Sequence, residues 1–362
     1  MRAAILREIG GAVRVEDVEL LPCGPNEVVV RITATSVCVT DALSACGHVA
    51  AQPPTLLGHA AAGVVEEAGE RVSRCRVGDR VVVVGTPECG SCYWCLRDQP
   101  AECAEMLAGI LPPRVIGRLA DGRAFHADGG VGTYAERTKL REINVVPVQS
   151  ALDDDVLSLL GCGVTTGLGA VFNVAEVQPG WSVAVVGCGP LGLWMIQGAR
   201  VAGATQIIAV EPDAERRGLA GELGATDLVN PADGDPVEQV KSLTGGRGAD
   251  CAFEAAGPPE AMAQAFAMAR PAGTVVPSGW STLDATVTLS AVDFAVGAKR
   301  VVGCQYGGAH TRRDVPRFAT MLERGVVDAR PLLDGRYGLE DVGKALRTSR
   351  ERRILTAIVA PG

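Results

Sequence analysis

The sequence predicts an α/β protein: an irregular, β-rich domain followed by a doubly wound domain on a six-stranded parallel sheet. The chain has 362 residues, which is too long for one compact core. Its first 160 or so residues hold strand-like apolar runs broken by Pro and Gly, with little helical periodicity. From about Trp181, apolar runs alternate with helical segments, which is the pattern of a parallel sheet with crossover helices.

The elements follow in order along the chain. In the first domain the clearest strands are Val28–Ile32 and Arg80–Val84. In the second, the predicted strands are Ser182–Val186, Gln206–Val210, Asp227–Val229, Ala249–Glu254, Gly273–Pro277 and Lys299–Gly303. The predicted helices between them are Leu191–Ala202, Ala214–Leu223, Pro236–Leu243 and Pro259–Ala269. Six such strands complete a Rossmann-type dinucleotide-binding fold. The tail after about Gly307 is too short for a domain of its own, so we expect it to return to the first domain.

Composition excludes several function classes. The net charge is −8 and no block of Lys or Arg occurs, which argues against a nucleic-acid partner. No apolar run is long enough to span a bilayer, and the N-terminus lacks the apolar core of a signal peptide, so we expect a soluble, cytoplasmic protein without a membrane partner. In such a compartment, clusters among the 12 cysteines bind metal or do chemistry more often than they form disulfides.

The strongest motif is a run of four cysteines, Cys89, Cys92, Cys95 and Cys103, with the spacing C-x2-C-x2-C-x7-C. Four thiolates this close can close a tetrahedral shell around Zn²⁺ and leave no position open. Such a site stabilises a loop and does not react. Unliganded or redox-active thiols are the alternative, which the tight clustering disfavours. The sequence therefore predicts a structural zinc.

The second motif is Gly187-Cys-Gly189-Pro-Leu-Gly192, placed between a predicted strand and a predicted helix. These glycines let a pyrophosphate approach the helix N-terminus, where N–H groups and the helix dipole favour anions. Glu211 ends the next predicted strand, where an acidic residue binds the adenosine ribose. Because its charge would repel a 2′-phosphate, we predict NAD and not NADP. An ordinary strand–helix turn is the alternative for an isolated glycine motif.

Three further residues, Cys38, His59 and Cys162, are scattered. Each alone is more often a buried thiol or a core imidazole than a ligand. Spacing does not bring them together.

The chain resembles the zinc-dependent medium-chain dehydrogenase/reductases, the alcohol dehydrogenases, over nearly its whole length. The matching pieces, in the family's order, are Val37-Cys-Val-Thr-Asp41, Gly58-His59, the four-cysteine lobe, Gly161-Cys162-Gly163, the glycine motif and Phe253-Glu-Ala-Ala-Gly257. The resemblance implies a GroES-like catalytic domain from residues 1–163 and 307–362, with the NAD-binding domain, 164–306, inserted between them.

The resemblance also assigns roles. Cys38, His59 and Cys162 match the ligands of a catalytic zinc, a Lewis acid toward the alcohol oxygen. Thr40 matches the hydroxyl residue of the proton relay, and Asp41 the carboxylate that orients the histidine. The residues expected to bind the cofactor are Gly187, Gly189, Leu191, Gly192, Glu211, Arg216 and Arg352.

Some positions depart from the family. Ala60 stands where glutamate usually follows the histidine, Leu43 where a histidine often ends the relay, and Val39 where many members have a basic residue. His48 is a candidate substitute in the relay, with a solvated loop histidine as the alternative. The expected substrate pocket also differs, with Gly85 in place of a common aromatic and with Tyr134, Trp280 and Gln305 at other lining positions.

These features predict an NAD-dependent dehydrogenase of an alcohol, bulky or aromatic, that forms the aldehyde or ketone. The alternatives within the fold are oxidation of a thiol–formaldehyde adduct and biosynthetic carbonyl reduction. The loop after Cys103 lacks the arginine with which some relatives bind the adduct's carboxylate. A non-catalytic binder of zinc and nucleotide is disfavoured because the ligand set is intact. We further expect a homodimer, because the 58 residues between Cys103 and Cys162 resemble the longer-loop, dimeric members.

Overall fold

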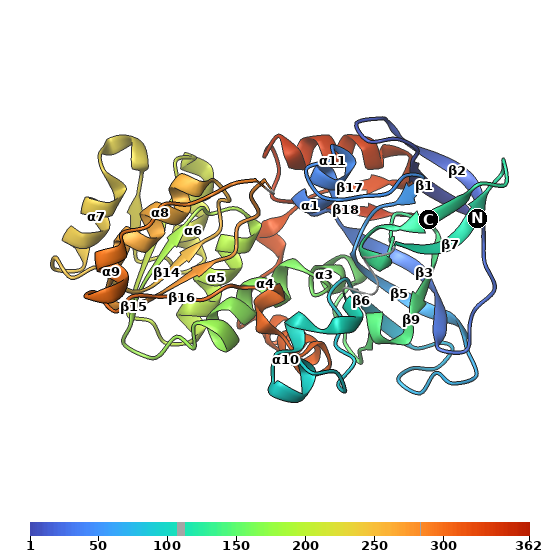
Figure 1. The fold of residues 1–362 in the computed structure, drawn as a ribbon, viewed down its shortest axis with the longest axis horizontal. Helices are drawn as coiled ribbons and strands as arrows, with labels where there is room; N and C mark the ends of the chain where they lie inside the picture. The colour runs from blue at the N-terminus through green and yellow to red at the C-terminus, as the bar shows by residue number, and fades with distance from the viewer. Residues whose placement is uncertain (107–112, 283) are drawn as a thin grey trace. The chain divides into compact units, whose positions relative to one another are not determined.

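The computed structural model describes residues 1–106, 113–282 and 284–362 (Figure 1). They form two compact units. The first comprises residues 1–165, 310–325 and 329–362, and the second comprises residues 166–309 and 326–328. No helix in the described residues is both long and apolar enough to cross a membrane.

The first unit contains two sheets in its described part. A closed barrel runs in the order β1 (Arg2–Leu6), β2 (Val13–Leu20), β7 (Arg114–Leu119), β8 (Ala124–Ala127) and β4 (Thr55–Leu56). A seven-stranded sheet runs in the order β10 (Val145–Pro147), β6 (Arg80–Val84), β5 (Ala60–Ala68), β3 (Glu27–Ser36), β18 (Thr356–Ala360) and β17 (Leu333–Gly338), with β9 (Arg137–Arg141) also paired to β3. Strands β17 and β18, from the C-terminal tail, thus belong to the same sheet as β3.

Helices of the first unit are α1 (Val39–Ala45), α3 (Asp154–Leu159), α10 (Thr311–Glu323) and α11 (Val342–Arg350), and α4 (Gly163–Gly169) crosses into the second. The barrel's fully buried Ile5 and Phe125 share a core with Leu346 of α11. On β3 and β6, apolar side chains such as Val30 and Val83 form a second core. Among the strands of this unit, β3 and β6 overlap segments that the sequence predicts.

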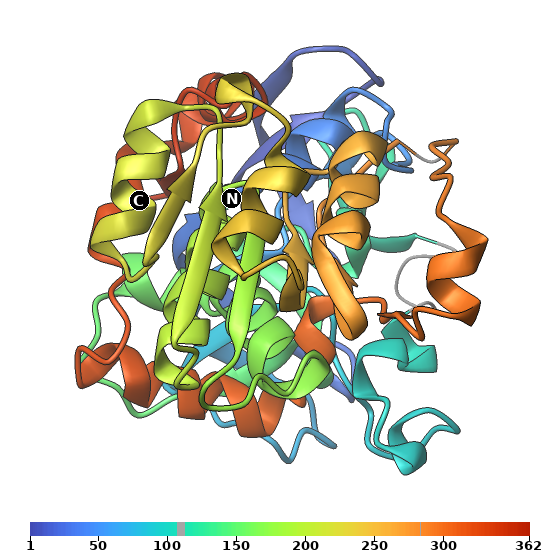
Figure 2. The same cartoon turned by 90° about the vertical axis from the view of Figure 1, so that its left-hand side faces the viewer.

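The second unit, in its described residues, is built on a six-stranded, all-parallel sheet in the order β13 (Asp227–Val229), β12 (Gln206–Val210), β11 (Ser182–Val186), β14 (Ala249–Glu254), β15 (Ala269–Pro277) and β16 (Arg300–Val301) (Figure 2). The helices are α5 (Pro190–Val201), α6 (Ala214–Glu222), α7 (Pro236–Leu243), α8 (Pro259–Met268) and α9 (Ala291–Ala295). This confirms the predicted α/β class with a doubly wound parallel sheet.

Local chemistry explains these helices and strands. Asp213 and Asp235 begin α6 and α7, because each side chain accepts a hydrogen bond from an unpaired N–H of the first turn. Alternate residues of β11 face opposite sides, and Ala184 and Val186 pack with Phe266 of α8. Because the strands are parallel, their carboxyl ends lie at the same edge of the sheet. The glycine turn follows β11 at this edge.

Candidate active site

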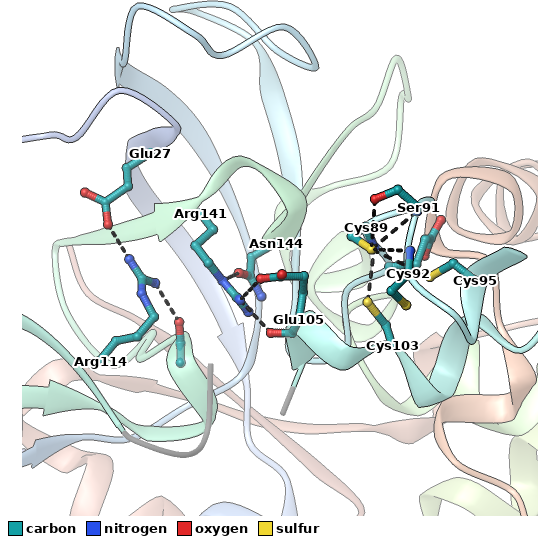
Figure 3. Close-up of polar contacts among 12 residues, drawn as sticks. Glu27, Cys89, Ser91, Cys92, Cys95, Cys103, Glu105, Arg114, Arg141 and Asn144 are labelled. Carbon is teal, nitrogen blue, oxygen red and sulfur yellow. Dashed lines mark hydrogen bonds and ion pairs between the residues drawn. The ribbon is translucent and has the colours of Figure 1, made fainter. Parts of the chain in front are cut away.

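The four-cysteine lobe brings its sulfurs together. The Sγ atoms of Cys89, Cys92, Cys95 and Cys103 all lie within 4.8 Å of one another (Figure 3). Cys89 Sγ accepts the N–H of Cys92 at 3.3 Å, and Cys103 Sγ accepts the N–H of Cys89 at 3.3 Å. Backbone hydrogen bonds lower the pKa of Cys92 to about 6. Four converging sulfurs, some already stabilised by N–H donors, fit a closed tetrahedral Zn²⁺ site.

A buried carboxylate next to the lobe anchors it to α10. Glu88 accepts hydrogen bonds from the Thr311 N–H at 2.7 Å, the Thr311 hydroxyl at 2.6 Å and the Arg312 N–H at 3.3 Å. Arg74 donates to the carbonyls of Glu88 and Cys89. The lobe is therefore fixed at its first ligand, a feature that the sequence did not indicate.

The three scattered residues also converge, within the first unit. Cys38 precedes α1, His59 lies between β4 and β5, and Cys162 follows α3. One ligand atom from each lies within 4.8 Å of the others. Two thiolates and one imidazole leave one position of a tetrahedral zinc open, which is the donor set of catalytic zinc sites.

Two glycines make this convergence possible. A Cβ atom on Gly161 would lie 2.4 Å from the Val83 carbonyl oxygen and 2.8 Å from the Ala60 Cα. Gly58 has φ +96°, and its Cβ would lie 2.4 Å from Thr133 Oγ1. Only glycine permits these approaches, so the family motifs Gly58-His59 and Gly161-Cys162 have a steric basis.

Behind His59 lies a hydrogen-bonded pair. Asp41 Oδ1 lies 2.8 Å from His59 Nδ1, and Asp41 is almost fully buried. The Tyr134 hydroxyl donates to Asp41 Oδ2 at 2.7 Å, and the Cys38 N–H donates to the same oxygen at 3.2 Å. With Nδ1 engaged by the carboxylate, His59 has Nε2 left for a metal.

The electrostatics of the three ligands reflect their proximity. Hydrogen bonding from Cys162 lowers the pKa of the Cys38 thiol, while its bond to Cys38 raises the pKa of Cys162. Burial lowers the pKa of His59, but the charges of Asp41 and Cys162 outweigh it, so the pKa ends well above its usual value. Burial and the Asp41 charge also raise the pKa of Asp128 to about 6. Sequence patterns had not singled out Asp128.

The residues predicted for the proton relay and the substrate pocket differ in burial and in their distance from the three ligands. Thr40 Oγ1 lies 3.2 Å from Cys38 Sγ, beside the ligands, whereas His48 is exposed in the loop after α1. A Cβ on Gly85 would lie 3.1 Å from His59 Cβ, so Gly85 packs against the ligand histidine. Trp280 and Gln305, both exposed, belong to the second unit. That these residues line one pocket stays a prediction.

Tyr134 needs a correction of role. The sequence places it on the wall of the substrate pocket, but its side chain is fully buried and its hydroxyl bonds Asp41. It therefore supports the carboxylate that orients His59. The sequence could not show this, because Tyr134 and Asp41 are 93 residues apart. The fold brings the segment before β9 against α1, and neither residue type nor spacing reveals that contact.

The glycine motif forms a tight turn between β11 and α5. Gly187 has φ +92°, and a Cβ there would lie 2.8 Å from the Ala256 Cβ. A Cβ on Gly192 would lie 1.9 Å from the Gly187 oxygen, whereas one on Gly189 would meet open space. The turn is therefore tightly packed at Gly187 and Gly192 and open at Gly189. Gly189 caps the N-terminus of α5, where backbone N–H groups can bind a phosphate.

The other predicted cofactor residues surround or extend this turn. Glu211 directly follows β12, and its Oε2 accepts the Cys188 N–H of the turn at 2.6 Å. Leu191 lies in the first turn of α5 and Arg216 in the first turn of α6. Arg217, which the sequence did not single out, donates to the Glu211 carbonyl at 2.7 Å. Arg352, after α11, is exposed and belongs to the first unit, so its contact with a pyrophosphate stays a prediction.

Comparisons with known proteins agree with this geometry. Residues 24–150 match the model of the alcohol dehydrogenase GroES-like domain, and residues 190–324 match that of the zinc-binding dehydrogenases. An S-(hydroxymethyl)glutathione dehydrogenase of Synechocystis sp. is 34% identical, with 99% of both chains covered. The chain belongs to the zinc-containing alcohol dehydrogenase family. Its two metal clusters and its glycine turn are those of a zinc-dependent, NAD(P)-linked dehydrogenase.

Two solved structures of this dehydrogenase family are also similar. Benzyl alcohol dehydrogenase from Acinetobacter calcoaceticus is 28% identical, with a TM-score of 0.93 over 100% of this chain and 99% of that one. A zinc-binding dehydrogenase from Sinorhizobium meliloti, bound to NADP, is 27% identical, with a TM-score of 0.83 over 99% of both chains. The predicted fold class and enzyme class are thereby confirmed.

Proposed function

We propose that this dehydrogenase oxidises the hydroxymethyl group of a thiol–formaldehyde adduct, with NAD as the hydride acceptor. The intact cluster of Cys38, His59 and Cys162, which supplies three of the four ligands that a tetrahedral zinc takes, carries the reaction class. Full-length similarity to an S-(hydroxymethyl)glutathione dehydrogenase supports the substrate class. This choice reverses the order of the sequence-based hypotheses, in which the adduct is the alternative to a bulky alcohol.

Each part of the site has a task in this reaction. Cys38, His59 and Cys162 would hold a zinc, which when bound supplies a Lewis acid for the substrate oxygen. Asp41 and Tyr134 would fix the His59 ring. The Thr40 hydroxyl, which lies 3.2 Å from Cys38 Sγ, would pass the substrate's proton outward. Cys89, Cys92, Cys95 and Cys103 would hold the second, structural zinc.

Two arginines that follow the lobe, Arg114 and Arg141, are already engaged. Arg114 Nη2 lies 2.5 Å from Glu27 Oε1, and Arg141 Nη1 lies 2.5 Å from the Glu105 carbonyl oxygen (Figure 3). Neither is poised to bind a carboxylate of the thiol. We therefore propose an adduct whose thiol need not be glutathione.

A second candidate is a bulky or aromatic alcohol, supported by the likeness to benzyl alcohol dehydrogenase. NAD reduction separates the two. Formaldehyde is offered with and without glutathione or cysteine, and benzyl alcohol without thiol. The proposal requires NADH formation that depends on thiol and exceeds that with benzyl alcohol. Thiol-independent turnover of benzyl alcohol at the higher kcat/KM establishes the second candidate. Biosynthetic carbonyl reduction would instead appear as faster NADH oxidation with aldehydes.

We further propose that NAD is preferred, because the Glu211 carboxylate lies beside the glycine turn, where a 2′-phosphate would meet a like charge. We also propose that residues 1–163 with 307–362 act as the catalytic domain and residues 164–306 as the NAD-binding domain.

A homodimer is a further proposal. In the described strand order, β16 ends the sheet of the second unit. Val292 and Val296, which precede β16 in the chain, are 66% and 81% exposed, and a second chain on this edge would cover apolar surface. Sedimentation equilibrium should give twice the chain mass, and a monomer or tetramer contradicts it.

A further inference from the structure

Glu254 is a buried carboxylate at the centre of the edge where the cofactor turn lies. It ends β14, paired with Val186 at the end of β11 and with Pro277 at the end of β15. Its exposed fraction is 2%. The crevice beyond the carboxyl ends of such strands, where the strand order reverses, is where ligands bind in open α/β sheets.

The carboxylate turns back onto two loops. Glu254 Oε1 accepts the N–H groups of Ala256 at 2.7 Å and Gly257 at 2.5 Å. Oε2 accepts the N–H of Gly279 at 3.2 Å, a donor that the Glu254 backbone carbonyl also accepts at 3.0 Å. Hydrogen bonds to an ionised acceptor are about twice as strong as neutral ones, so this side chain fixes the first loop and, together with the Glu254 backbone carbonyl, the second.

The first loop is the floor of the glycine turn. Ala256 lies so close to Gly187 that a Cβ on Gly187 would be 2.8–3.0 Å from three Ala256 atoms. The Ala255 N–H also donates to the Val186 carbonyl at 2.9 Å, immediately before the turn. A shift of Ala256 would therefore move the backbone that faces the pyrophosphate.

The second loop is joined to the first just above the carboxylate. A Cβ on Gly257, which has φ +99°, would lie 2.3 Å from the Trp280 carbonyl oxygen. Because Gly257 packs directly against Trp280, the two loops should move together. The Glu254 carboxylate binds one residue on each side of this contact, Gly257 and Gly279.

We propose that Glu254 is a positioning residue for the dinucleotide. Through Ala256 it fixes the position of the glycine turn, and through Gly279 it helps to fix the position of the 278–280 loop. The inference rests on the nucleotide part of the proposed function and not on the choice of substrate. Glu254 acts through backbone groups and need not touch the cofactor.

The test uses Glu254→Gln in the full-length chain. Glutamine has one acceptor oxygen and one NH₂ group, so it cannot accept from both loops. Its NH₂ group must face an N–H donor, either that of Gly279, which keeps only its 3.0 Å bond to the Glu254 carbonyl, or those of Ala256 and Gly257, which lose their acceptor. The dissociation constant of NADH is measured by the enhancement of NADH fluorescence, and thermal unfolding and zinc content are recorded alongside. Binding of NADH by the wild type is measured first. If the wild type does not bind NADH, the proposed cofactor is wrong, and that result is distinct from a failure of the role proposed for Glu254.

The matched control is Asp250→Asn, at the opposite end of the same strand. Asp250 also accepts two bonds on one oxygen, from the Ser182 N–H and hydroxyl at 2.8 Å each, and contacts Arg270 at 2.6 Å. We expect Glu254→Gln to weaken NADH binding about ten- to a hundredfold, with zinc unchanged. Asp250→Asn should lower the unfolding temperature comparably and leave NADH affinity within about twofold of wild type.

Equal NADH affinity in Glu254→Gln and wild type, or equal losses in both variants, overturns the proposal and leaves Glu254 as a stabilising residue only. If Glu254→Gln is insoluble, Glu254→Asp serves, because the shorter side chain cannot reach both loops. The same NADH measurement on it then decides.

Discussion

The Tyr134 hydroxyl lies 2.7 Å from Asp41 Oδ2, on the carboxylate whose other oxygen meets His59 Nδ1 at 2.8 Å. The family's usual glutamate after the histidine is replaced here by Ala60. Orientation of His59 therefore depends on the Asp41 carboxylate and the tyrosine behind it.

Replacing Tyr134 with Phe should weaken the catalytic metal site. The Asp41 oxygen would lose a buried donor, and loss of such outer partners costs about 10- to 100-fold in metal affinity or activity. Zinc retention during chelator challenge and kcat measure the effect. Tyr337→Phe, a half-buried tyrosine on β17, is the control and should behave as wild type. Unchanged zinc retention and kcat in Tyr134→Phe would show that Asp41 needs no such support.

The two zinc sites should be separable. Cys162→Ser should remove turnover and one of two zincs while the fold survives, because the open site is not needed to close a loop. Cys95→Ser should instead lower stability or prevent soluble expression, since the closed site stabilises its lobe. Cys23→Ser, outside both clusters, should retain two zincs and full activity. One zinc or none in the wild type would contradict this assignment.

Glu211 should determine the choice of cofactor. Its charge against a 2′-phosphate should favour NAD over NADP by about a thousandfold in kcat/KM. Glu211→Ala should lose most of that ratio, both by removing repulsion and by removing the ribose contact. Glu215→Gln, an exposed carboxylate on α6, is the control and should leave the ratio unchanged. Equal efficiency of both cofactors in the wild type would refute the role of Glu211.

Sequence predicted the second unit far better than the first, for physical reasons. The strands β11, β12, β13 and β14 begin and end where the apolar runs do, because buried parallel strands read as continuous apolar segments bounded by turns. In the first unit, strands as short as β4 carry no such pattern.

The same contrast holds for the sites. The four cysteines of the lobe are local, so spacing alone predicts their cluster. Cys38, His59 and Cys162 converge only through the sheet and the close approaches at Gly58 and Gly161, so only the family resemblance indicated them. The bond from Tyr134 to Asp41 left no signal in the sequence.

Glu88 should contribute strongly to stability. Its buried carboxylate accepts three hydrogen bonds from Thr311 and Arg312. Glu88→Ala should lower the free energy of unfolding by about 2–3 kcal/mol, because the N–H and hydroxyl of Thr311 would be left buried without an acceptor. Urea unfolding measures the loss. Glu136→Gln, which breaks a largely exposed pair with Arg2, should cost under about 1 kcal/mol. Equal losses in the two variants would show that Glu88 does not anchor the lobe.

Gly85 offers the sharpest distinction between two roles. The sequence suggests that its lack of a side chain enlarges the substrate pocket, whereas the structure shows that a Cβ there would press on His59, at 3.1 Å from Cβ and 3.5 Å from Cδ2. A methyl group at this distance must displace the ring by a few tenths of an ångström or be displaced itself. Because small misplacements at a reacting centre are costly, Gly85→Ala should lower kcat/KM for benzyl alcohol and ethanol together, about tenfold each.

The ratio of kcat/KM for benzyl alcohol to kcat/KM for ethanol distinguishes the two roles of Gly85. If Gly85 acts on His59, the ratio stays constant in Gly85→Ala and in Gly85→Phe, and zinc dissociates faster from both. If Gly85 acts on pocket volume, zinc is retained and Gly85→Phe shifts the ratio toward ethanol, since a ring would fill the space that a bulky alcohol needs. Gly338→Ala, where a Cβ meets no atom within 4 Å, controls for the glycine substitution itself and should change neither quantity.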